Sequence, residues 1–145
     1  MTALTGTVVY AAKNGESGQQ YAGLGKYTLG GALANADTIT WTNLLPKGKF
    51  KVLGFKFWGP EIDTNATPTA TFTIGDGTDA DGYLTTKGGA VGLQNSLADQ
   101  LSYEGDGALI GTTQEGRNVV LTVTAAVATG ATSGTIWVQP IIEGL

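Results

Sequence analysis

The densest group of acidic side chains lies between Gly75 and Gly82, where Asp76, Asp79 and Asp81 are two or three residues apart. Carboxylates at this spacing could bind Ca²⁺, which takes about six to eight oxygen ligands. An EF-hand loop requires carboxylate ligands at its first and twelfth positions, but the alignment that fits Asp79, Asp81 and Gly82 places glycine at both. The spacing favours a turn in which aspartates accept hydrogen bonds from backbone amides, with a looser calcium site at the three aspartates as the alternative.

Two pairs of carboxylates have the spacing of a possible acid–base couple, as in glycosidases. They are Glu61 with Asp63 and Glu104 with Asp106, and each lies beside glycine or proline in a predicted loop. No apolar pocket that would raise a carboxyl pKa is indicated nearby. The chain contains no histidine and no cysteine, so the usual general base, thiolate metal sites and disulfides are excluded. We therefore expect no enzymatic activity, no metal and no cofactor.

Lysines gather around one predicted strand, although the 145-residue chain carries a net charge of −4. Four of them are Lys47, Lys49, Lys51 and Lys56. The neighbouring aromatic residues are better explained as core than as stacking platforms, and the acidic balance disfavours nucleic acid as a partner. A solvated strand face is the first interpretation of these lysines, and contact with an acidic protein surface is the second.

Residues 1–31 contain glycine at short intervals. Each glycine adds to the entropy that ordering the backbone must overcome. We therefore expect residues 1–31 to form an arm that a partner orders, followed by one folded domain over residues 32–145; a glycine-rich hairpin packed on its own domain is the alternative. Tyrosines in such an arm would supply contact area with a polar tip. The candidate partner-binding residues are Tyr10, Tyr21, Tyr27, Lys47, Lys49 and Lys51.

Hydrophobic residues alternate with threonine through much of residues 38–128, which predicts strands with one buried face. Between Lys49 and Trp58 the hydrophobic phase slips beside Gly54, and a β-bulge there would restore a continuous buried face. Pro140 cannot donate a ladder hydrogen bond, so we expect the closing strand over residues 135–142 to lie at a sheet edge, at least near its end.

Several short strands, turns rich in glycine and aspartate, and no long helical pattern predict an all-β, single-domain β-sandwich. Among sandwiches we favour a jelly-roll-like topology, with an immunoglobulin-like one as the alternative. No apolar run approaches the roughly 18 residues that a membrane-spanning helix needs, and the start of the chain is a poor secretory signal. We expect a soluble protein made in the cytoplasm, with no membrane partner.

Three stretches resemble small virion proteins of tailed bacteriophages. Residues 45–54, LPKGKFKVLG, are similar to an LPAGARVLGV-type strand of that family, with Lys47-Gly48-Lys49 where the family often has GAR. Residues 63–79, DTNATPTATFTIGDGTD, continue the likeness, and residues 119–130, VVLTVTAAVATG, resemble its VTVTAAAATGAAGTV hairpin. The resemblance spans about residues 37–140 in the same order, and the glycine-rich start has no counterpart in it.

The resemblance implies a head decoration, or cement, protein with a β-sandwich fold. Such a protein binds the major capsid protein on the outer surface of the virion, commonly as a homotrimer, and stabilises the shell. The first alternative is another virion component, such as a tail or head-fibre subunit. The second is a carbohydrate-binding module that uses Trp41, Trp58 or Trp137 as a sugar platform, although Trp41 alternates with threonine in the phase of a core residue.

Overall fold

The computed structural model describes residues 2–14, 20–46, 50–60, 63–87, 101–104, 109–110 and 118–144, and these residues form strands and turns without a helix. No segment of the described residues is a helix able to span a membrane. The strands are β1 (Ala3–Thr5), β2 (Thr7–Tyr10), β3 (Lys13–Asn14), β4 (Gln20–Tyr21), β5 (Leu24–Thr28), β6 (Thr38–Trp41), β7 (Phe50–Trp58), β8 (Thr71–Gly75), β9 (Leu84–Lys87), β10 (Leu101–Glu104), β11 (Leu109–Ile110), β12 (Val119–Ala125) and β13 (Thr135–Gly144).

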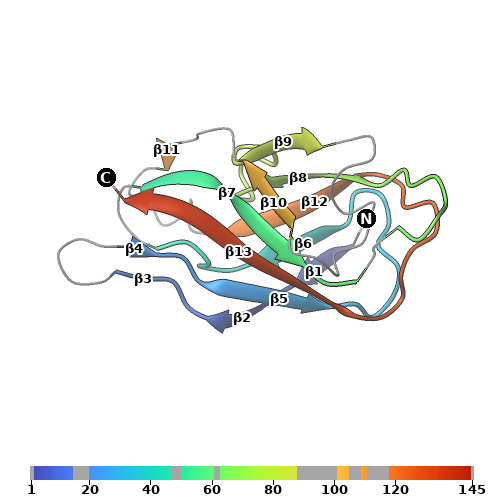
Figure 1. The fold of residues 1–145 in the computed structure, drawn as a ribbon, viewed down its shortest axis with the longest axis horizontal. Helices are drawn as coiled ribbons and strands as arrows, with labels where there is room; N and C mark the ends of the chain where they lie inside the picture. Colours follow the sequence, from blue (N-terminus) through green and yellow to red (C-terminus); the bar gives the residue numbers. More distant parts are fainter. Residues whose placement is uncertain are drawn as a thin grey trace.

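The strands form two main sheets that pack face to face as a β-sandwich, which confirms the predicted fold class (Figure 1). The first sheet has the order β1-β6-β12-β8-β9. The second has the order β10-β7-β13-β5-β2, with β11 also paired to β7. The short strands β3 and β4 form a separate hairpin. In Figure 1 the long strand β13 crosses the molecule between β7 and β5, with strands of the first sheet in the layer behind.

Eight strands pair in a nested order. Strand β5 pairs with β13, β6 with β12, β7 with β10, and β8 with β9, all antiparallel. The pairs β7–β13 and β8–β12 then join these couples into the two sheets. Each sheet therefore combines strands from the beginning and the end of the chain, so neither half of the sequence contains a complete sheet.

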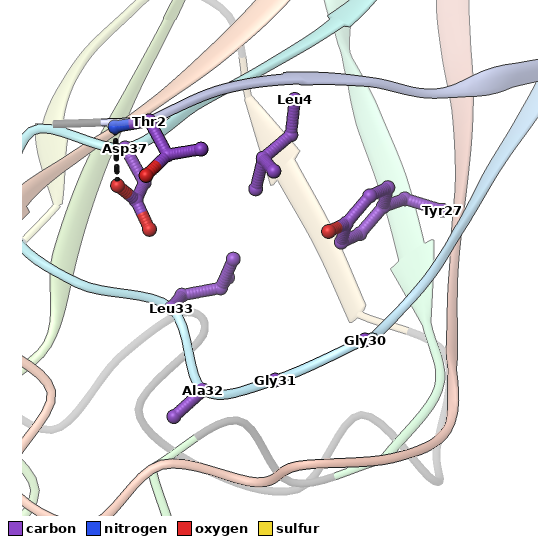
Figure 2. A pocket seen from close by; sticks show the side chains of 8 residues that line it. All are labelled: Thr2, Leu4, Tyr27, Gly30, Gly31, Ala32, Leu33 and Asp37. Carbon is purple, nitrogen blue, oxygen red and sulfur yellow. Dashed lines mark hydrogen bonds between the residues drawn. The ribbon is translucent and has the colours of Figure 1, made fainter.

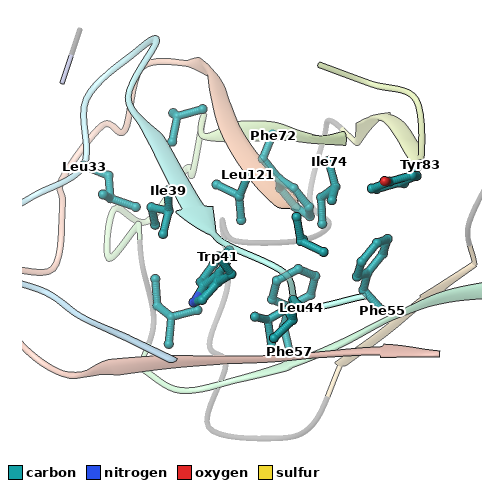
Figure 3. Packing of buried hydrophobic residues seen from close by; sticks show 14 of the residues in the cluster. Leu33, Ile39, Trp41, Leu44, Phe55, Phe57, Phe72, Ile74, Tyr83 and Leu121 are labelled. Carbon is teal, nitrogen blue, oxygen red and sulfur yellow. The ribbon is translucent and has the colours of Figure 1, made fainter. Parts of the chain in front are cut away.

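The core lies between the two sheets. Phe55 and Phe57 of β7 are fully buried and face β8, where the rings of Phe57 and Phe72 meet edge to face with centroids 5.9 Å apart (Figure 3). Ile39 and Trp41 of β6 are fully buried as well, as the alternation with threonine predicts. Complete burial of Trp41 excludes this residue as a sugar platform.

A β-bulge at Leu53 confirms the slip predicted beside Gly54. In the pairing of β7 with β13, Ile141 lies opposite Gly54 and Ile142 lies opposite Val52, so Leu53 is the extra residue. Its side chain is 38% exposed, whereas Val52 is fully buried. The bulge moves Leu53 out of the alternation and keeps the apolar residues on both sides of it on the inner face.

The edge position predicted for the closing strand is wrong for the first part of β13 and correct near its end. From Thr135 to Val138 the strand lies between β5 and β7. Pairing with β5 stops at Val138, and beyond it the described ladder runs only to β7, with Pro140 opposite Phe55. Proline is tolerated there because the ladder on one side has already ended.

Residues 1–31, expected to lie apart from the sandwich, contribute strands to both sheets. Strand β1 adds to the first sheet in parallel with β6, while β2 and β5 belong to the second. A Cβ atom at Gly6 would overlap the indole of Trp41, and one at Gly25 would lie 2.6 Å from its Cδ1. These two glycines therefore make room for the buried side chain of Trp41. From composition alone, the same glycines had indicated an arm separate from the folded domain.

Candidate functional site

The structure separates the described members of the predicted partner-binding set. Tyr10 lies at the end of the edge strand β2 and is 61% exposed. Tyr27 lies on β5 opposite Ile136, is half-buried and packs against the core. Tyr21 and Lys51 lie in β4 and β7, but their side chains are outside what the structure describes. Lys47 and Lys49 also fall outside the described residues.

Tyr27 borders a partly open pocket of about 330 Å³ at one side of the sandwich. The pocket lies between the start of the chain, through β1, and the segment that links β5 to β6 (Figure 2). It brings together residues that are about thirty positions apart in the sequence. The lining residues are Thr2, Leu4, Tyr27, Gly30, Gly31, Ala32, Leu33 and Asp37.

Asp37 is the charged residue of this pocket and is only 5% exposed. Its Oδ1 accepts a hydrogen bond from the Thr2 amide at 2.8 Å, and its Oδ2 accepts one from the Ala34 amide at 2.9 Å. Its own carbonyl accepts a hydrogen bond from the Val123 amide at 2.9 Å, which ties this residue to β12. The carboxylate is therefore held in a fixed position at the pocket wall.

The other walls of the pocket are mainly apolar. Leu4 and Leu33 approach the space from opposite walls, and the hydroxyl end of Tyr27 is directed into it (Figure 2). Sequence reasoning selected Tyr27 but missed the pocket and Asp37. The sequence gives only a weak signal for Asp37, because an isolated aspartate before a strand resembles an ordinary turn residue.

A second surface feature is a row of side chains on the outer face of the second sheet. Trp58 and Trp137 lie opposite each other on β7 and β13, with nearly parallel rings (5°) and centroids 6.2 Å apart. From β5, on the other side, Lys26 places its Nζ 5.7 Å from the Trp137 ring centroid. Both faces of Trp137 are thus occupied. A sugar platform requires an open ring face, so this geometry argues against Trp137 as such a platform.

Asp63, considered above as half of a catalytic pair, is a structural residue. It is fully buried, and its two carboxylate oxygens accept five backbone hydrogen bonds of 2.9–3.2 Å. Burial alone would raise the pKa of this carboxyl, but the hydrogen bonds hold it well below its ordinary value of 3.8. A general acid needs the opposite shift. The donors are the amides of Asn65, Thr69, Ala70, Ala128 and Thr129.

The remaining members of the two carboxylate pairs do not assemble a described site. Glu61 and Asp106 lie outside the described residues, and Glu104 is opposite Gly54 in the pairing of β10 with β7. With Asp63 committed to backbone amides, the Glu61–Asp63 pair is not available as an acid–base couple, and the side chains of Glu104 and Asp106 lie outside what the structure describes.

The aspartate-rich turn after β8 has the predicted form. Asp76 Oδ1 accepts hydrogen bonds from the amides of Thr78 and Asp79, at 2.8 and 2.9 Å. Asp79 Oδ1 in turn accepts a longer one from the Asp81 amide, at 3.4 Å. Within the described ranges, no group of three acidic side chains could hold a metal ion. The carboxylates of this turn therefore stabilise its backbone.

Comparison with known proteins gives one informative likeness. The sequence matches no family model and no curated protein. Its fold is similar to a solved chain of the cyanophage Pam1 capsid asymmetric unit, with a TM-score of 0.69 and 28% sequence identity. The match covers 94% of this chain and 92% of that chain, so it includes most of residues 1–31. This likeness supports a phage capsid-related protein with a structural role in the virion.

Proposed function

We propose that this protein is a capsid decoration protein that binds the major capsid protein on the outside of a phage head and stabilises the shell. The observation that carries the proposal is the likeness, over almost the full length of both chains, to a chain of a phage capsid. The sequence resemblance to small virion proteins, which runs through β7, β8 and β12, supports the same conclusion.

A neutral protein surface is available for such binding. The outer face of the first sheet carries a row of threonines in which Thr38 and Thr122 lie opposite each other and are partly exposed, whereas Thr73, opposite Thr122 on β8, is only 4% exposed. Beside this row, the hydroxyls of Thr71 and Thr124 lie 2.7 Å apart. A partner that binds only the assembled shell stabilises it by mass action, and many copies on one particle make weak individual contacts sufficient.

We also assign the sandwich to the jelly-roll class. Its support is the nested pairing of the first of eight strands with the last, the second with the seventh, and so on inward. That order results when one long antiparallel hairpin is rolled into two layers, as in double-sheet jelly rolls.

The proposal further includes a homotrimer without catalytic activity or cofactor. Closed cyclic assemblies of identical subunits fit symmetric positions on a shell. A role that consists of binding needs no reactive group, which agrees with the structural roles found for Asp63 and Asp76.

The test is binding of the purified protein to mature capsids that lack it. We expect cosedimentation with these capsids and an increase in their disassembly temperature, since ligands that bind only the assembled state stabilise it. Capsids of an unrelated phage serve as the control. No cosedimentation at saturating protein would contradict the proposal. Density for the protein on tails instead of heads in electron micrographs would favour the tail or fibre alternative.

A further inference from the structure

Asp37 and Asp63 are the two buried carboxylates of the described chain, and their charges are compensated to different extents. Asp63 accepts five backbone hydrogen bonds, whereas Asp37 accepts two. An ionised carboxylate offers about four lone-pair sites, so Asp37 retains free acceptor capacity. No ion pair joins it to a cation of the described residues. Buried aspartates are almost always paired, which indicates that a cation from elsewhere completes this site.

The volume and the lining of the pocket next to Asp37 fit one long side chain. The pocket volume of about 330 Å³ is close to the lower end of ligand pockets, which range from about 300 to 1,000 Å³. Leu4, Leu33 and the Tyr27 ring provide apolar walls, and Gly30 and Gly31 leave open space. Arginine and lysine bury an aliphatic stem against apolar surface while the charged end seeks a polar partner.

We propose that this pocket accepts a basic side chain of the major capsid protein, arginine in particular, with Asp37 as its counter-ion. The inference rests on the proposed function for the identity of the partner. The guanidinium lies against the carboxylate of Asp37, since arginine donates paired hydrogen bonds in a fork that matches a carboxylate. The aliphatic stem lies in the space between Leu4 and Leu33, into which the Tyr27 hydroxyl also points as a further polar group (Figure 2).

The first experiment measures the ligand chemistry without capsids. N-acetyl-arginine amide is titrated into the ¹⁵N-labelled full-length protein, and N-acetyl-citrulline amide, neutral and nearly identical in shape, is the control. We expect saturable shifts of the Thr2 and Ala34 amides, which donate to Asp37, with the arginine compound only. The Thr69 and Ala128 amides, which donate to Asp63, should not move. Equal responses to both compounds, or none, would overturn the inference.

The second experiment fills the pocket and measures capsid binding. Gly31 lines the pocket and a Cβ there meets no atom within 4 Å, so Gly31→Leu adds a bulky side chain at the pocket wall without a clash at Cβ. We expect at least tenfold weaker binding to capsids, with an unchanged circular dichroism spectrum and unfolding midpoint. Thr78→Leu, at an exposed position outside the pocket, is the matched control and should bind like the wild type. Asp37→Asn, where it folds, should weaken binding similarly.

The outcomes separate the pocket from the proposed function. Wild-type protein that fails to bind capsids contradicts decoration, while the arginine titration still reports on the pocket chemistry. Wild-type and Gly31→Leu proteins that bind capsids equally well contradict the pocket inference and leave decoration intact. If Gly31→Leu changes the oligomeric state instead of capsid binding, the occupant is a second copy of this chain, and the assigned partner is wrong.

Discussion

At the scale of single residues, identical side chains have different roles because their surroundings differ. Asp63 holds the loop after it against residues 128–129 through five amides, whereas Asp76 only closes an exposed turn with two. Asp37 also accepts hydrogen bonds from two amides, but it is buried and has an open pocket beside it. Burial with only two donors, next to a pocket, thus distinguishes this candidate binding residue from the two structural aspartates.

Replacing Asp63 by asparagine should reduce the free energy of unfolding by about 3 kcal/mol or more, because several buried amides lose a charged acceptor. The measurement is urea unfolding followed by circular dichroism. Asp76→Asn is the matched control, and its effect should stay below about 1 kcal/mol because its turn is exposed to water. Equal effects of the two substitutions would contradict the structural role of Asp63.

The stability of the wild type should also depend on pH through Asp63. Its pKa is lowered in the folded protein, so the unfolded chain binds the proton more readily. The stabilisation is fully present above the unfolded pKa of about 3.9 and is lost as the pH falls toward the folded pKa. Between about pH 5 and pH 2 the wild type should lose stability more steeply than Asp63→Asn, as measured by thermal unfolding. Parallel pH profiles would show that Asp63 is not the titrating group.

At the scale of elements, the first strands belong to the sandwich because they cover the buried side chain of Trp41. The indole of Trp41 donates a hydrogen bond to the Lys26 carbonyl at 3.0 Å, and it packs against Gly6 and Gly25. Gly6 lies where the chain passes from the first sheet to the second, and its amide donates to the Thr40 carbonyl at 2.8 Å. A strand that changes sheets in this way closes one corner of a sandwich.

Gly25→Ala should destabilise the protein by about 1–3 kcal/mol, because the added methyl group would press on an indole that a hydrogen bond holds in place. Gly31→Ala meets open space and should be neutral or stabilising by up to about 1 kcal/mol, since it reduces the entropy of the unfolded chain. Urea unfolding of both variants tests the contrast. A neutral Gly25→Ala would show that Trp41 can move away.

Deletion of residues 1–31 should abolish cooperative unfolding as well as capsid binding. The deletion removes β5, which pairs with both β2 and β13, and exposes one side of the core around Trp41. Thermal unfolding followed by near-ultraviolet circular dichroism measures this effect. A truncated protein that keeps a sharp transition and loses only capsid binding would instead support the partner-ordered arm expected from the glycine content.

At the scale of the whole molecule, the two outer faces of the sandwich offer different chemistry. The first sheet presents neutral threonine rows, and the second presents the Lys26–Trp137–Trp58 row. Two unlike faces on one subunit allow a contact with the shell and a contact with a neighbouring copy to coexist. A closed ring of copies is a natural assembly for such a subunit.

If the proposed homotrimer forms, native mass spectrometry should detect a species of three chains, each of 14.8 kDa. Because three chains combine into one species, mass action should increase the trimer fraction with protein concentration. Trp137→Ala tests whether the tryptophan row lies in this contact: loss of the trimer places it there, and an unchanged trimer places the contact elsewhere. A protein that stays monomeric at all concentrations would contradict the homotrimer, although not the decoration role.

The sequence by itself determined the features that depend on neighbours in the chain. Alternation in a strand assigns Ile39, Trp41 and Phe72 to the core, and a slip of that alternation locates the bulge at Leu53, because successive side chains point to opposite faces. Only the tertiary structure decided the roles of Gly25 and Asp63. Gly25 faces a tryptophan sixteen positions away, and the donors to Asp63 lie up to 66 positions away. Contacts at such separations are set by strand pairing, which leaves no periodic trace in the sequence.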